Sequence, residues 1–314
     1  MVEAKIENIK NMRRKASVIK QTIRELSDGK LGEETKVNQP DYPELFTAAM
    51  LCTSSIKDSV GSKNKEWSLK AKYNINEPFL TKIRLHNERN LEISKQFVVE
   101  ATQLHPVTKR ICDRMSQIRG ITPYSIGLLI SYYKSIHKAK RFGNFASYAG
   151  YAVIQDMTLS KNNWNKIKLK QAEEGIEWQG FNIKLKTRIY ILVDSVLKAR
   201  GFYKKEYDRI WPRLYERSIN EGSSELREDG VYYIKDRKSH KTVSWAKENA
   251  KKRIGRNLLN HLYNEWRIAE GLPPENPYVK DYLGHISVVS LDEVIEYDKN
   301  VVVKNNRKSK EETE

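Results

Sequence analysis

The sequence is poor in cysteine and has no long apolar run, and both shortages exclude whole classes of protein. Only Cys52 and Cys112 occur among 314 residues, which argues against a disulfide framework or a cysteine-based metal cluster. No stretch of about 18 apolar residues occurs, so no membrane span is expected. The first residues lack the apolar core of a signal peptide. These absences predict a cytoplasmic, nucleoid-associated protein that has no membrane partner.

Residue patterns that would indicate a metal centre are also missing. The six histidines are scattered, and no HExxH or similar spacing occurs. Asp156, Asp194 and Asp208 have no other carboxylates clustered around them, so we interpret them as ion-pair partners. No internal repeat is present. The sequence therefore predicts neither a metal site nor a cofactor.

What the chain does have is an excess of positive charge. It contains 57 Lys and Arg against 40 Asp and Glu, a formal net charge of +17. Such an excess favours a polyanionic partner. A Lys-rich solvated surface is the alternative, but such surfaces usually balance Lys with Glu. We therefore predict DNA as the partner, with RNA as an open alternative.

Apolar residues recur at three-to-four spacing along most of the chain, which predicts a mainly α fold, a helical bundle with a helical N-terminal arm. Helices are expected over residues 2–27, 43–56, 77–104, 126–136, 182–200, 203–219 and 243–270. Trp211, Trp245 and Trp266 lie on apolar helix faces and are expected in the core. Residues 57–75 are weakly patterned, 286–303 are ambiguous, and 304–314 form a charged tail expected to be disordered.

These elements divide into four expected regions. An N-terminal arm covers residues 1–75, and its helices are a candidate route to homo-oligomers. A helical pair with a DNA-binding region covers residues 76–180, and a C-terminal helical region covers residues 181–285. The last region is the tail, residues 286–314.

Residues 118–126 read Ile-Arg-Gly-Ile-Thr-Pro-Tyr-Ser-Ile, with helical sequence on both sides. This is the outline of the hairpin of a helix-hairpin-helix DNA-binding element, in which backbone N–H groups and a helix N-terminus face a phosphate. Gly120 would allow the tight turn and a close approach of the nucleic acid. Gly120, Ile121 and Thr122 are therefore candidate DNA contacts. The alternative is a plain helix–turn–helix corner.

Basic residues gather in three further places. One group directly follows the hairpin's second helix and suits phosphate contact: Lys134, Lys138, Lys140 and Arg141. A second group flanks two helices, and its three arginines from 209 on share one helix face: Lys184, Lys186, Arg188, Arg209, Arg213 and Arg217. A third group lies on the last strong helix: Lys247, Lys251, Lys252 and Arg256. Solvated helix faces are the competing interpretation of the last two groups.

The hairpin and the block Arg141-Phe142-Gly143-Asn144-Phe145-Ala146-Ser147-Tyr148-Ala149-Gly150-Tyr151 together resemble one family. They are similar to the C-terminal domain of insertion-sequence transposases that carry an N-terminal RuvC-like DEDD domain, the bridge-RNA recombinase class. That domain has an I-P-G-I-G-P hairpin followed by an R-F…A-G-L block. Asn182 to Lys186, and then Ala246, Ala250 and Arg253, resemble its later helices. The resemblance covers roughly residues 80–270 and implies DNA binding in transposition and recombination.

The departures from that family limit what the resemblance implies. The family's nuclease domain opens with an apolar strand ending in an aspartate that binds Mg²⁺, whereas this chain opens with a basic amphipathic helix. The family's serine nucleophile stands in a Ser-Gly pair, whereas Ser160 is followed by Lys161. We therefore expect a DNA-binding relative without its own nuclease centre. The alternatives are an active recombinase that uses Ser160, Mg²⁺ or a partner nuclease, and a helical oligomeric assembly protein.

Overall fold

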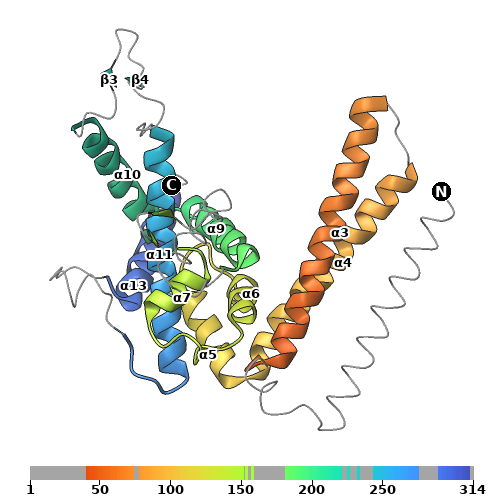
Figure 1. Ribbon diagram of the computed structural model, residues 1–314, viewed down its shortest axis with the longest axis horizontal. Coiled ribbons are helices and arrows are strands. Elements are labelled where there is room, and N and C mark those ends of the chain that lie inside the picture. The colour runs from red at the N-terminus through yellow and green to blue at the C-terminus, as the bar shows by residue number, and fades with distance from the viewer. Residues whose placement is uncertain are drawn as a thin grey trace, which may run out of the picture. The chain divides into compact units, whose positions relative to one another are not determined.

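The computed structural model describes residues 40–73, 78–151, 181–220, 243–275 and 289–311, together with four two-residue strands. The fold is a mainly α helical bundle, as the sequence predicted (Figure 1). Its helices are α3 (Pro43–Tyr73), α4 (Pro78–Leu104), α5 (Pro106–Met115), α6 (Pro123–Tyr133), α7 (Phe142–Tyr148), α9 (Ile183–Lys198), α10 (Phe202–Asn220), α11 (Val243–Ala269) and α13 (Leu291–Glu311). Strand β1 (Val153–Ile154) pairs with β2 (Met157–Thr158), and β3 (Glu225–Leu226) pairs with β4 (Tyr232–Tyr233), both antiparallel.

Residues 44–314 form one compact unit, and α11 is the helix around which its core is built. It packs against α5, α7, α9 and α10. Its apolar stripe, with Ile254, Leu258, Leu262 and Trp266, is fully buried. The spacing of these residues predicted both the helix and the burial of Trp266. Trp211 and Trp245 are partly buried beside Leu214, also as expected.

Aromatic rings fill the centre of this core. Tyr133 of α6 stacks on Phe145 of α7, with ring centroids 3.6 Å apart, and Trp266 of α11 meets Phe145 edge-on at 6.3 Å. The Tyr133 hydroxyl donates to the Phe145 carbonyl at 3.0 Å, so its polar atom is satisfied inside the core. The short helix α7 is thereby fixed between α6 and α11.

Helix α3 is much longer than the sequence indicated. We expected a helix ending near residue 56, but α3 continues to Tyr73. Its second half lacks an apolar stripe and is joined to α4 by ion pairs and polar contacts instead. Glu66 accepts from Arg84 at 2.6 Å, and Lys63 lies 3.0 Å from Glu88. Periodicity of apolar residues cannot detect a helix that is attached through its charges.

The C-terminal segment corrects the expectation of a disordered tail. Residues 291–311 are helical in α13, and Val294, Ile295 and Asp298 on it are buried. The chain just before it is bound to α11, since His261 Nε2 donates to the Val289 carbonyl at 2.9 Å while Nδ1 accepts from the Tyr203 hydroxyl. Burial lowers the pKa of His261, which keeps this ring neutral.

Within the described ranges, no helix combines the length and apolar character that crossing a bilayer requires. Residues 2–27 lie outside these ranges, so the N-terminal arm and its proposed oligomer contacts stay predictions.

Candidate nucleic-acid interface

The turn between α5 and α6 is tight, and its glycine is in contact with protein. Gly120 has φ +87°, a conformation that a side chain disfavours. A Cβ built there would lie 2.7 Å from the Ser195 carbonyl oxygen and 2.8 Å from the Val196 Cα. Ser195 Oγ also donates to the Gly120 carbonyl at 2.8 Å. The close approach that the sequence assigned to nucleic acid at Gly120 is therefore made by α9.

Most backbone N–H groups of this turn already have acceptors within the protein. The Arg119 amide donates to the Asp298 carboxylate at 2.8 Å, and the Ile121 amide donates to the Ile118 carbonyl at 3.1 Å. The Thr122 amide donates to Ser125 Oγ, which completes a capping box at the start of α6. Ile121 is buried as well. A nucleic acid at this turn would therefore depend on side chains more than on amides.

Replacing Gly120 with alanine should destabilise the fold by about 1–3 kcal/mol, because the residue has a positive φ and no space for a Cβ. Urea unfolding followed by circular dichroism measures this change. Gly61, inside α3, has open space around it, so Gly61→Ala should instead add about 0.5–1 kcal/mol. Equal stabilities of the two variants would contradict the proposed packing of Gly120 on α9.

Four basic residues that the sequence placed in three separate groups lie on α11 or on the elements packed against it. Lys252 and Arg256 are one turn apart on α11, and both are exposed. On α9, which packs against α11, partial burial lowers the pKa of Lys186, and the positive charge of Lys252 adds to this effect. The Arg256 guanidinium lies 6.0 Å from the Phe142 ring centroid. Phe142 directly follows the exposed Arg141, which is the N-cap residue of α7.

Two glycines allow α7, α9 and α11 to meet this closely. Gly150 has φ +73°, and a Cβ there would lie 2.8 Å from the Phe181 ring and 3.0 Å from Lys186 Cδ. On α11, a Cβ at Gly255 would lie 2.5 Å from the Tyr151 ring. Tyr151 thus packs against α11 at Gly255, and Phe181 packs against Lys186 of α9. We name Arg141, Lys186, Lys252 and Arg256 the basic cluster.

Within the part of the chain that the structure describes, the exposed members of the basic cluster have no carboxylate partner. Among the described residues, none forms an ion pair with Arg141, Lys252 or Arg256. The Glu275 carboxylate accepts the Phe142 amide, next to Arg141 in the chain, at 2.7 Å. Like charges of this kind repel each other in the isolated protein, and an anion removes the repulsion. The cluster is therefore suited to a phosphate group.

The neighbouring Lys251 has a different role. It lies 2.9 Å from Asp194 and 3.7 Å from Glu248, and Glu248 accepts the Tyr190 hydroxyl at 2.6 Å. These contacts join α11 to α9 and set the register that brings Lys252 beside Lys186. The prediction that Asp194 and Asp208 are ion-pair partners is confirmed, since Asp208 pairs with Lys204.

The remaining predicted basic contacts have varied surroundings. Lys134 has its Nζ 5.3 Å from the Phe46 ring centroid, while three other lysines are exposed: Lys138, Lys140 and Lys184. Arg209 pairs with Glu206 at 2.6 Å, and Arg213 and Arg217 are exposed on α10. Ser160 lies outside the described residues.

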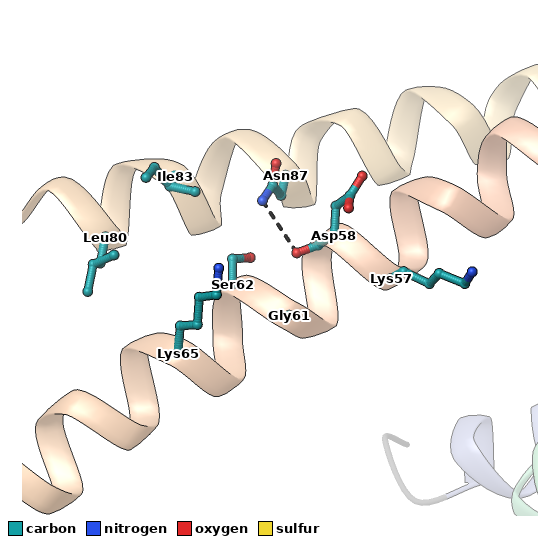
Figure 2. Close-up of a pocket in the computed structure, with 8 residues that line it drawn as sticks. All are labelled: Lys57, Asp58, Gly61, Ser62, Lys65, Leu80, Ile83 and Asn87. Atoms are coloured by element: carbon teal, nitrogen blue, oxygen red, sulfur yellow. Dashed lines mark hydrogen bonds between the residues drawn. The ribbon is translucent and has the colours of Figure 1, made fainter. Parts of the chain in front are cut away.

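A hollow of about 420 Å³ opens between α3 and α4. Figure 2 shows Asn87 of α4 reaching across to the Asp58 carbonyl, with Lys57 and Lys65 leaving α3 in different directions. Ser62 Oγ donates to the Ser59 carbonyl. The side chains of Asn87 and Ser62 are thus hydrogen-bonded within the helix pair. Lys57 and Lys65 do not converge on the hollow, so we assign no ligand to it.

Comparison of the chain with protein family models, with curated proteins and with solved structures found no match.

Proposed function

We propose that this chain binds the sugar-phosphate backbone of DNA, as a relative of insertion-sequence transposases. The observation that carries the proposal is the basic cluster, because Arg141 at the start of α7 and Lys252 and Arg256 on α11 are exposed and form no ion pair with a carboxylate among the described residues. Backbone contacts from Lys and Arg orient a protein on DNA without reading its sequence. The proposed role is thus a DNA grip of low sequence specificity. The resemblance in residues 118–151 supports the link to transposition.

The hairpin has an indirect role in this proposal, through its packing on the basic helix α9. Its turn packs on α9, and α9 carries Lys184, Lys186 and Arg188. The predicted hairpin and the predicted basic helix are therefore one structural assembly. The overall charge of +17 would add long-range attraction to a polyanion.

A salt titration tests the proposal. Fluorescence anisotropy with a labelled random-sequence duplex should give a log–log plot of affinity against salt with a slope steeper than about −3, since each neutralised phosphate contributes about −0.9. An RNA duplex of the same sequence, titrated in parallel, tests the alternative partner. Absence of binding at low salt would refute the proposal, and tighter binding to RNA would replace DNA with RNA.

A further inference from the structure

A cavity of about 190 Å³ lies between the start of α6 and the exposed side of α9. Its apolar wall includes Leu128, which is buried, and Ile191, which is 53% exposed. Tyr124, Thr122 and Ser195 also line the cavity. The cavity is smaller than those that hold drug-sized ligands. Its size and mixed lining suit a single planar ring with polar edges.

One cation stands at this cavity. Arg188 lines it, and within the described part of the chain no carboxylate pairs with Arg188. Lys184 lies one helical turn earlier on the same face of α9 and is exposed. One stripe on α9 thus contains Lys184, Arg188, Ile191 and Ser195. The stripe begins with two basic residues, and its residues from Arg188 on line the cavity. An anionic group attached to the planar ring would meet Arg188 as the ring enters.

A nucleotide has this combination of features, a flat base carried on a phosphate. We infer that the cavity receives one unpaired nucleobase of distorted or single-stranded DNA, with the adjoining phosphate at Arg188. Tyr124 and the apolar wall would contact the base faces, as aromatic and apolar side chains do in single-strand binding proteins. An unpaired base enters such a cavity at the lowest cost, since no base pair has to be broken. This inference rests on the proposed function and adds a preference for DNA shape.

The test uses the full chain and two labelled duplexes of equal length, one fully paired and one with a single unpaired 2-aminopurine. The bulged duplex should bind at least about fivefold more tightly, the lower bound for one base stacked on protein. The 2-aminopurine fluorescence should fall on binding. Ile191→Ala and Arg188→Gln should each reduce the preference toward unity.

Two matched controls lie on the same helix and do not line the cavity. Ile183 is 49% exposed and Lys198 is exposed, so Ile183→Ala and Lys198→Gln should keep the preference for the bulged duplex. Equal affinity for the two duplexes, with salt-dependent binding retained, would overturn the cavity assignment and leave the backbone proposal standing. Absence of salt-dependent binding to both would refute the proposed function itself.

Discussion

Reversing the charge of Lys252 and Arg256 together should lower the affinity for duplex DNA about 100-fold at moderate salt and make the salt slope shallower by about two units, one for each lost phosphate contact. Both side chains are exposed, and neither forms an ion pair with a described carboxylate, so the double variant K252E/R256E should fold normally. It would also place two carboxylates beside Lys186, which removes the attraction for a phosphate there. Anisotropy titrations at several salt concentrations measure both effects.

The control for this experiment changes the same amount of charge elsewhere. Lys57 and Lys65 on α3 line the hollow between α3 and α4, so the variant K57E/K65E lowers the net charge equally. We expect it to reduce the affinity only a few-fold, through the general loss of positive potential. If both double variants weaken binding equally, the binding depends on net charge and the basic cluster has no special role.

Replacing Asp298 with alanine should destabilise the protein by about 2–6 kcal/mol, because two buried N–H groups would lose their acceptor at about 1–3 kcal/mol each. The Asp298 carboxylate is 1% exposed and accepts from the Arg119 amide at 2.8 Å and from the Phe202 amide at 2.6 Å. It thereby links α13 to the α5–α6 turn and to the first residue of α10. The carboxylate fits there because residue 201 is glycine, since a Cβ at Gly201 would clash with it.

Urea or thermal unfolding of D298A, followed by circular dichroism, measures the loss. The control is Asp292→Ala on the same helix, since Asp292 is 78% exposed and forms only a surface ion pair with Arg114. That variant should lose less than about 1 kcal/mol. A D298A protein as stable as D292A would show that α13 contributes little to the fold, contrary to the buried position of Asp298.

The sequence predicted the elements whose apolar residues face a core. The expected helices at 77–104, 182–200, 203–219 and 243–270 correspond to α4, α9, α10 and α11 within a few residues. Their stripes bury Leu185, Ile189, Ile254 and Leu258 completely, and burial of apolar surface is what produces helical periodicity. The mainly α class follows from the same pattern.

The sequence did not predict the second half of α3 or helix α13, because the contacts of these segments are polar or are made with residues distant in sequence. Glu66 meets Arg84 across the helix pair, and Asp298 meets an amide 179 residues away. A carboxylate in an isolated helix looks like any solvated residue, and only its partner shows that it is buried. The same limit applied to Lys252 and Arg256, which the sequence could list only as one basic group among several.

What the sequence determined by itself is thus the helical class, most helix boundaries, the excess of positive charge and the position of the turn at Gly120. Each of these depends on neighbours along the chain or on composition. The tertiary structure decided that Gly120 faces α9, that the Asp298 carboxylate accepts the Arg119 amide of the turn, and that Arg256 lies over the Phe142 ring. These are contacts between segments far apart in the chain, and their geometry exists only after α7, α9 and α11 have packed together.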